Sequence, residues 1–509
     1  MCMKMGGAII MAKINIILGP PGTGKTENLL RIVDRELKDG TPPDRIAFVS
    51  FTTKATNEAR DRAKIKFNLN DKDFPYFCTL HAFGKRQLGI TRSQIMDKND
   101  YVDCSEKKGI DLTKTSSSWN DNGLVTTDNI YLRDINKSRM QCLELQDYYN
   151  KSNVEYSWND LIHVYRSLED YKQNNDKYDF TDMLTQYVEF GPVPTLDVVI
   201  VDEAQDLTKL QWDMCQKIWK NAKRVYISGD DDQAIFRWAG ADIEHLIKME
   251  GKVSVLKQSY RCPKSVHGVA HEIVNRISKR REKEWNPRDE IGEVRFHNHI
   301  NGINIREGKW LVLSTAGYML NEIEEDLRYQ GLPYNLYGNP AVKKSLLRAV
   351  DAWKRLRNDE EISYKDVAAI YDNLKSGVGV ERGYKTLKTL EEEQSYDVES
   401  LTMHHGLMYS DVPWDVAFNV ISDNDKSYVM SMEKHGGLTA ETKINLSTIH
   451  MAKGGECDNV MLLTDLSRSN QDEMEKNPDD TNRVFYVGAT RAKQALHIVQ
   501  PQRGGGFII

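Results

Sequence analysis

A phosphate-binding pattern, G-x-x-x-x-G-K-T, occupies residues 19–26 in the form GPPGTGKT. Its glycines let backbone N–H groups close around phosphate oxygens, and a helix that begins there adds its positive dipole end. The Lys25 ammonium has the reach to contact the β- and γ-phosphates, and the Thr26 hydroxyl is a ligand for Mg²⁺. We predict that the whole loop holds the phosphates of a nucleotide: Gly19, Pro20, Pro21, Gly22, Thr23, Gly24, Lys25 and Thr26.

Two adjacent acids, Asp202 and Glu203, follow the apolar stretch 195–201. An acidic pair at the end of an apolar strand, downstream of a phosphate loop, suits hydrolysis of a nucleoside triphosphate. Asp202 is expected to hold Mg²⁺ through water, and Glu203 is expected to orient and polarise the attacking water. Gln233 follows a further apolar stretch, 223–229, and is expected to sense the γ-phosphate.

Several other residues allow two interpretations each. Trp238 offers a surface on which a nucleic-acid base could stack, although a buried core tryptophan also fits its position. Phe51 and Thr52 end an apolar stretch and could stack a base and contact a phosphate, and an ordinary capped helix is the alternative. His81, within the stretch TLHAF, is by itself more typical of a structural residue.

Alternating strands and helices are needed to bring these residues together. Apolar stretches typical of buried strands occupy residues 13–18, 45–51, 77–83, 195–201 and 223–229, and a second group lies at 309–314, 334–338 and 443–450. Two stretches of different composition, at about 88–175 and 345–438, are charged and mostly helical in pattern. The pattern predicts two α/β units with parallel sheets, each carrying a mostly helical insertion.

The composition is that of a globular protein, with 40% hydrophobic residues, 28% charged residues and a net charge of −6. This charge excludes a uniformly basic surface, but it allows a local basic groove for nucleic acid. No apolar run reaches the ~18 residues of a membrane span, and residues 1–11 lack the layout of a signal peptide. The seven cysteines form no C-x-x-C pair, which is typical of reduced thiols in a cytoplasmic protein.

The order of the motifs carries a resemblance to a known family. GPPGTGKT, SFTTKATNEA, TLHAF, YDFTDML, VDEAQD, GDDDQAIFRWAGA, QSYRCP, STIHMAKGGE and YVGATRAK succeed one another between residue 14 and about residue 499. In this order they resemble the motifs of superfamily 1 DNA helicases of the UvrD/PcrA/Rep type. The resemblance implies two RecA-like lobes, with ATP and Mg²⁺ bound in the cleft between them.

The resemblance also implies a division of the chain into lobes and insertions. The first lobe is expected to comprise residues 1–87 and 176–257, with its helical insertion at 88–175. The second lobe is expected to comprise residues 258–344 and 439–509, with its insertion at 345–438.

By the same resemblance, Arg261 and Arg491 look like arginine fingers that reach the γ-phosphate from the second lobe. Such groups are worth ~10³–10⁵ in rate. Tyr260 is similar to a residue that packs near the base of the nucleotide, and Glu456 is similar to one that contacts the ribose. The single-stranded DNA track of the family corresponds here to Phe51, Thr52, His81, Trp238, Thr448 and His450.

The sequence departs from the family pattern in three ways. None of the 18 residues before Gly19 resembles the family's adenine-recognition motif, so we expect weak discrimination between ATP and GTP. The arginine that usually follows the tryptophan of the GDDDQ motif is replaced by Ala239, so coupling between ATP and DNA is expected to differ. The second insertion and the C-terminal tail are short, and partner contacts of longer relatives are not assumed.

The resemblance implies an ATP-dependent 3′→5′ helicase that translocates on single-stranded DNA and opens tailed duplex DNA. Two alternatives stay open. One is a translocase that displaces proteins or drives a partner nuclease, and the other is a nucleotide-gated DNA-binding switch. The intact Lys25, Glu203, Arg261 and Arg491 favour a working hydrolase over the switch.

Overall fold

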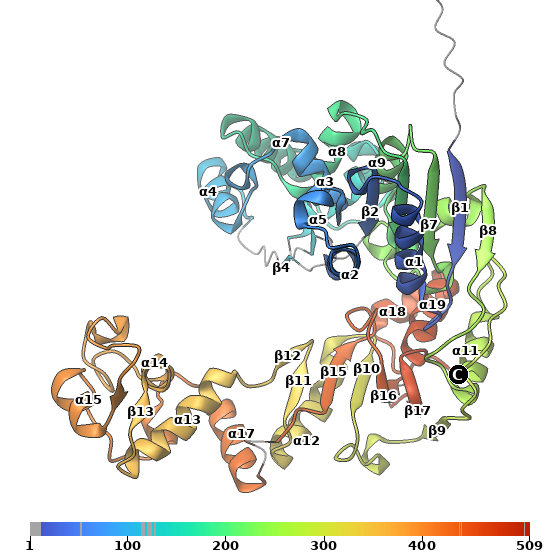
Figure 1. Ribbon diagram of the computed structural model, residues 1–509. Coiled ribbons are helices and arrows are strands. Elements are labelled where there is room, and N and C mark those ends of the chain that lie inside the picture. The colour runs from blue at the N-terminus through green and yellow to red at the C-terminus, as the bar shows by residue number, and fades with distance from the viewer. Residues whose placement is uncertain are drawn as a thin grey trace, which may run out of the picture. The chain divides into compact units, whose positions relative to one another are not determined.

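The computed structural model describes residues 12–50, 53–112, 118–119, 125–126, 129–436, 438, 440–502 and 504–509 (Figure 1). The chain divides into two compact units, and each is described by itself. The first unit comprises residues 1–291 and 473–490, and the second comprises residues 292–472 and 491–509.

The first unit is built on a six-stranded sheet with the order β3–β2–β6–β7–β1–β8, in which all neighbouring strands are parallel. Its strands are β1 (Lys13–Leu18), β2 (Ile46–Ser50), β3 (Phe77–Thr79), β6 (Val198–Asp202), β7 (Arg224–Gly229) and β8 (Lys252–Val255). The middle strands are continuous apolar runs, because a parallel sheet is covered by helices on both faces.

Helices cover both faces of this sheet. Leu29 of α1 and Phe48 of β2 belong to the apolar core on one face, and Trp212 of α9 and Val201 of β6 belong to the core on the other. Outside the insertion described next, the helices of this unit are α1 (Lys25–Lys38), α2 (Thr53–Phe67), α3 (Leu80–Leu88), α8 (Phe180–Phe190), α9 (Lys209–Ile218), α10 (Ile243–Lys248), α11 (Lys264–Val274) and α19 (Pro478–Ala489).

The stretch between α3 and α8 is mostly helical, and it has an apolar core of its own that includes Cys104, Leu132 and Leu161. It contains α4 (Lys98–Lys108), α5 (Ile130–Met140), α6 (Leu145–Lys151), α7 (Trp158–Asn174) and a hairpin of β4 (Ser118–Trp119) with β5 (Val125–Thr126).

The second unit contains a seven-stranded sheet with the order β12–β11–β15–β10–β16–β17–β9. All neighbouring strands are parallel except β11 and β12. The strands are β9 (Glu293–His297), β10 (Trp310–Ser314), β11 (Tyr334–Leu336), β12 (Asn339–Pro340), β15 (Ile444–Thr448), β16 (Cys457–Leu463) and β17 (Ala492–Val499). Two mainly parallel sheets with helical additions confirm the predicted α/β class and agree with two RecA-like lobes.

The helical part of the second unit shares one apolar core with the sheet, from Val312 of β10 through Trp353 of α13 to Phe418. The helices are α12 (Asn321–Gln330), α13 (Lys344–Arg357), α14 (Tyr364–Asn373), α15 (Val398–His404), α16 (Trp414–Ala417) and α17 (Asp423–Lys434), and α18 (Arg468–Lys476) follows the sheet strand β16. A hairpin of β13 (Ile362–Ser363) and β14 (Ser395–Tyr396) lies among them.

Short 3-10 helices lie at several connections. Three of them carry site residues: η4 (Ala204–Asp206), η5 (Asp231–Gln233) and η6 (Arg237–Ala239). The others are η1 (Pro43–Arg45), η2 (Asp71–Asp73), η3 (Arg92–Gln94), η7 (Ile300–Gly302), η8 (Gly317–Leu320) and η9 (Tyr384–Thr386).

The compact units and the division expected from the resemblance differ in two places. The first unit continues past residue 257 to residue 291, and α19 belongs to it, whereas the resemblance assigned 439–509 to the second lobe. Packing explains the difference, because α11 and α19 contact each other and Arg483 of α19 donates to the carbonyl oxygen of Asp231 at 3.0 Å. The six-part division itself stays a prediction.

Candidate nucleotide-binding site

The phosphate loop connects β1 directly to α1. Gly22 and Gly24 adopt φ angles of +69° and +75°, a region that side chains other than glycine rarely enter. The amide of Gly19 donates to the carbonyl oxygen of Gly229 at 3.0 Å, which ties the start of the loop to the end of β7. The loop therefore opens at the carboxyl edge of the sheet, where α/β proteins bind their ligands.

Lys25 lies along this loop. Its Nζ donates to the carbonyl oxygen of Gly19 at 2.8 Å, and a Cβ on Gly19 would come within 2.0 Å of its Cγ. Thr23 closes the turn by donating its hydroxyl to the carbonyl oxygen of Pro20 at 2.8 Å. A side chain at position 19 would therefore displace the lysine from its place along the loop.

Asp202 ends β6 and is almost fully buried. Its Oδ1 accepts the amide of Glu203 at 2.9 Å, but no group among the described residues donates to its Oδ2. Burial, and then the Glu203 carboxylate, raise the pKa of Asp202 to about 7, while Lys25 acts in the opposite direction. A buried carboxylate oxygen without a donor fits a hard cation such as Mg²⁺.

Glu203 holds a left-handed backbone conformation, with φ of +52°. Such strain in a residue other than glycine costs of order 1–3 kcal/mol and concentrates at functional sites. Oε2 of Glu203 accepts the side-chain amide of Gln205 at 2.6 Å. The strained turn therefore presents the carboxylate in one defined orientation.

Gln233 is held by the acidic turn that follows β7. Its side-chain amide donates to Oδ2 of Asp230 at 2.6 Å, and its backbone amide donates to the carbonyl oxygen of the same residue at 2.8 Å. Lys283 also stabilises this turn. Its buried ammonium contacts Asp230, Asp231 and Asp232 at 3.3, 2.6 and 2.9 Å.

The strand order explains why these residues converge. β7 lies between β6 and β1, and Leu18 of β1 pairs with Gly229 of β7. The phosphate loop, the acidic pair and the Asp230 turn therefore leave three neighbouring strands at the same edge. The structure brings the loop, Asp202, Glu203 and Gln233 to this edge, and their contacts with a nucleotide stay a prediction.

The segment after β8 also reaches the phosphate loop. The Ser259 hydroxyl donates to the carbonyl oxygen of Pro21 at 2.8 Å. The backbone amide of Tyr260 donates to the carbonyl oxygen of Gly22, also at 2.8 Å. A Cβ on Gly22 would come within 2.3 Å of the Cβ of Arg261. Arg261 accordingly belongs to the first unit, whereas the resemblance expected it to reach the site from the second lobe.

The other candidates for nucleotide binding lie in the second unit. Arg491 is buried, and one of its guanidinium nitrogens donates to the carbonyl oxygen of Gly455 at 3.1 Å. Glu456 is exposed and lies 3.7 Å from the ammonium of Lys493. Their roles toward the γ-phosphate and the ribose stay predictions.

The candidates for DNA contact differ in exposure. Trp238 is 53% exposed and lines a groove of about 530 Å³ together with Lys209 and Arg237. Trp238 is therefore not a buried core residue. His81 is only 6% exposed, and no described residue bonds its Nε2. Thr448 ends β15 and His450 follows it, and both are half-buried. The remaining candidates, Phe51 and Thr52, lie outside the described residues.

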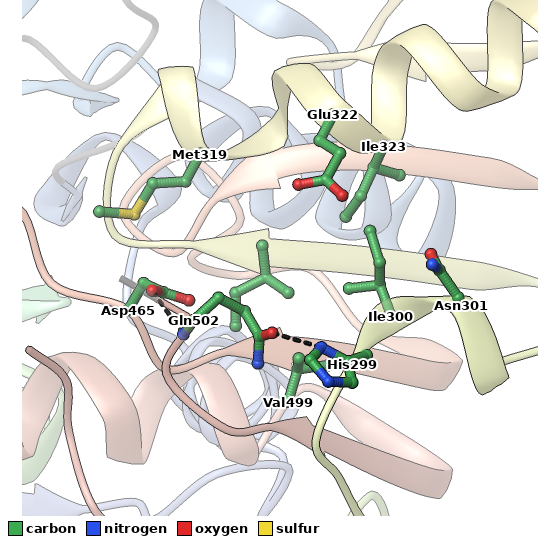
Figure 2. A pocket seen from close by; sticks show the side chains of 10 residues that line it. His299, Ile300, Asn301, Met319, Glu322, Ile323, Asp465, Val499 and Gln502 are labelled. Carbon is green, nitrogen blue, oxygen red and sulfur yellow. Dashed lines mark hydrogen bonds between the residues drawn. The ribbon is translucent and has the colours of Figure 1, made fainter. Parts of the chain in front are cut away.

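A separate pocket of about 110 Å³ lies in the second unit, near the ends of β9, β16 and β17 (Figure 2). Within it, Nδ1 of His299 and Oε1 of Gln502 are 2.6 Å apart. The backbone amide of Gln502 donates to Oδ1 of Asp465 at 2.9 Å. None of the residues predicted from the sequence lines this pocket. This pocket is therefore not part of the predicted site.

Comparison with known families decides the class of this chain. Residues 8–254 match the UvrD/REP helicase N-terminal domain, and residues 384–503 match the UvrD-like helicase C-terminal domain. Together the two matches cover most of the sequence. The chain belongs to the UvrD/PcrA/Rep-like superfamily 1 helicases. Membership makes it an ATP-dependent DNA helicase.

Relatives of this helicase are distant in sequence. It is 23% identical to the probable DNA helicase II homolog of Rickettsia conorii, over 96% of its own chain and 90% of that protein. It is 25% identical to the ATP-dependent DNA helicase PcrA of Bacillus subtilis, over 72% of its own chain and 54% of that protein.

Two further findings concern membrane-spanning helices and groups of metal-binding side chains. In the part of the chain that the structure describes, no helix combines the length and the hydropathy needed to cross a membrane. Across the same described residues, no three His, Cys, Asp or Glu side chains are grouped so as to hold a metal ion. A Mg²⁺ ion held by Asp202 and the Thr26 hydroxyl would therefore rely on phosphate oxygens and water for its remaining ligands, as this ion usually does.

Two buried residues beside the site were not singled out by sequence reasoning. Gln205 stands in the VDEAQD motif, but its position alone did not indicate that it contacts Glu203. Lys283 is 52 residues from Asp231, within a run of charged residues that would normally be a solvated surface. The one signal near it in the sequence is the apolar Trp285, two residues further on, which is also buried.

Proposed function

We propose that this helicase is an ATP-driven motor that moves 3′→5′ along single-stranded DNA and separates duplex DNA ahead of it. The observation that carries the proposal is the convergence of the phosphate loop, the strained Glu203 and the Gln233 turn at one edge of the sheet. Family membership supports the same conclusion.

Each residue of the site has one part in the proposed hydrolysis. Lys25 leaves the Gly19 carbonyl oxygen to neutralise the β- and γ-phosphates, and Gln233 senses whether the γ-phosphate is present. Glu203 orients the attacking water, and Arg261 and Arg491 stabilise the charge of the transferred phosphoryl group. Asp202 and Thr26 would hold Mg²⁺, which supplies further neutralisation of phosphate charge when it is bound.

DNA movement is proposed to use aromatic stacking, with Trp238 as the main platform. One base stacked on an aromatic side chain is worth ~1–3 kcal/mol. Separating one base-pair step costs ~1.4 kcal/mol on average. The two quantities are similar, which suits a motor that advances in small steps. Thr448 and His450 are proposed to contact the strand from the second unit.

The test uses two duplexes, one with a 3′ single-stranded tail and one with a 5′ tail. Strand separation from the 3′ tail only, with ATP and Mg²⁺, is the expected result. The control is Lys25→Ala, which should abolish turnover because the phosphates lose their cation. Unwinding from the 5′ tail, or DNA-stimulated turnover that survives Lys25→Ala, would contradict the proposal.

Two other outcomes would point to the alternatives. Turnover that single strands stimulate without any unwinding would favour a translocase that displaces proteins or drives a partner nuclease. Turnover that DNA does not stimulate would favour a nucleotide-gated switch.

A cytoplasmic location belongs to the same proposal, and it is supported by the absence of any disulfide among the described cysteines.

A further inference from the structure

Gln205 joins the two halves of the hydrolytic site through its side chain. It is fully buried within η4. One amide hydrogen points to Oε2 of Glu203 at 2.6 Å, and its Nε2 also lies 3.1 Å from Oδ2 of Asp206. Its Oε1 accepts the backbone amide of Asp230 at 2.9 Å. Both ends of one amide are therefore used, the donor end toward Glu203 and Asp206 and the acceptor end toward the turn of Gln233.

Gly229 provides independent evidence that this contact shapes the local backbone. A Cβ on Gly229 would come within 2.7 Å of Oε1 of Gln205 and 3.3 Å of its backbone nitrogen. No positive φ requires glycine at this position. Space for Gln205 is the reason that the structure gives for a glycine at the end of β7.

We propose that Gln205 is a positioning residue that orients the Glu203 carboxylate and couples it to the γ-phosphate-sensing turn. This inference rests on the proposed function. Asp230 accepts the side-chain amide of Gln233, so a shift of Gln233 toward a γ-phosphate moves Asp230. Gln205 follows through its bond to the Asp230 amide, and Glu203 turns with it. Without Gln205, the Glu203 carboxylate would lose this hydrogen-bond donor, while its backbone would keep the strained conformation.

A glutamine serves this role better than a glutamate. A carboxylate at position 205 would keep the acceptor for Asp230 but would face Glu203 and Asp206 as a third negative charge. A methionine would fill the volume and lose both bonds. Gln205→Glu and Gln205→Met therefore separate the donor function from the acceptor function.

The experiment measures steady-state ATP turnover with saturating single-stranded DNA. Both variants are expected to lower kcat roughly 10- to 100-fold, the usual effect of losing a supporting hydrogen bond, with KM for ATP unchanged. The matched control is Gln211→Glu. Gln211 is also buried, and its Oε1 accepts the amide of Thr208 in a capping box that a glutamate satisfies equally well. This control should keep the wild-type kcat.

A double variant guards against a merely structural effect. On a Glu203→Gln background, Gln205→Glu should cause no further loss of kcat, because both changes act through the same oxygen. An additive loss, or wild-type kcat in Gln205→Glu, would overturn the inference. If the unaltered protein shows no DNA-stimulated turnover, the proposed function fails instead. Binding of a fluorescent ATP analogue confirms that each variant is folded.

Discussion

The ammonium of Lys283 lies 2.6 Å from Oδ1 of Asp231, and neither side chain is exposed to solvent. Asp232 shares this cation at 2.9 Å and also binds Arg280 through two nitrogens, at 2.8 and 2.7 Å. Three consecutive carboxylates can be buried together only because these cations are buried with them. The arrangement fixes the turn from which Gln233 projects.

Lys283→Met is expected to destabilise the first unit by about 3–5 kcal/mol, because it leaves buried carboxylates without their cation. The measurement is the urea midpoint of unfolding, followed by tryptophan fluorescence. Lys279→Met is the control. Lys279 is 75% exposed and contacts Glu244 at 3.5 Å, so its loss should change stability by less than about 1 kcal/mol. Equal midpoints for the two variants would argue against a structural role for the Lys283 ammonium.

Trp238→Ala is expected to weaken binding of single-stranded DNA about 5- to 150-fold, which corresponds to ~1–3 kcal/mol for one stacked base. Trp238→Phe should recover part of the affinity because it keeps an aromatic face. Fluorescence anisotropy with a labelled oligothymidine measures both. Phe190→Ala removes an aromatic ring that is 73% exposed at the end of α8, and it should leave the affinity unchanged. The stacking role is refuted if Trp238→Ala binds as tightly as the parent.

The burial of His81 predicts a dependence of stability on pH. Burial lowers the pKa of His81 from 6.5 to about 4, so the unfolded chain binds a proton in this interval that the folded chain does not. Folding stability should therefore be complete above pH 6.5 and fall by about 3 kcal/mol as the pH drops toward 4. His81→Phe should lack this part of the slope, whereas the exposed His163→Phe should keep it. Parallel slopes for all three proteins would contradict the prediction.

Gly229→Ala should lower kcat, because the new Cβ displaces Gln205 from Glu203. The overlap, which also involves Leu246 at 3.1 Å, should cost about 1–3 kcal/mol of stability. Gly268→Ala is the control within the helix α11, where a Cβ meets nothing within 4 Å. It should stabilise the protein by roughly 0.5–1 kcal/mol, as expected for alanine in place of a helical glycine. Thermal melting and turnover assays distinguish the two outcomes.

Local patterns were sufficient to predict the α/β class, five of the six strands of the first sheet and three of the seven strands of the second. The phosphate loop is recognisable because a strand, a glycine-rich turn and a helix are contiguous in sequence. Asp202 and Glu203 are recognisable because they follow a continuous apolar run. In each case the chemistry depends on neighbours in the chain, which the sequence displays.

The remaining features depend on contacts between distant segments. The sequence does not reveal that Lys283 is buried against Asp231, because a charged run normally faces water. It also does not reveal that His81 is buried, since one histidine in an apolar stretch suits either a core or a surface. Motif order suggested the second lobe for Arg261, but bonds from Ser259 and Tyr260 to the phosphate loop determine where the segment lies.

The two separate stretches that make up the first unit have a consequence for biosynthesis. Because α19 spans Pro478–Ala489, this unit is complete only after residue 490 has been synthesised. Until then Asp231 lacks the donor supplied by Arg483, and α11 lacks the helix that packs on it. Domains normally fold in order as they leave the ribosome. Here the unit that contains β1 is completed only when α19 has been synthesised, so the turn before Gln233 gains its Arg483 donor after the rest of the site.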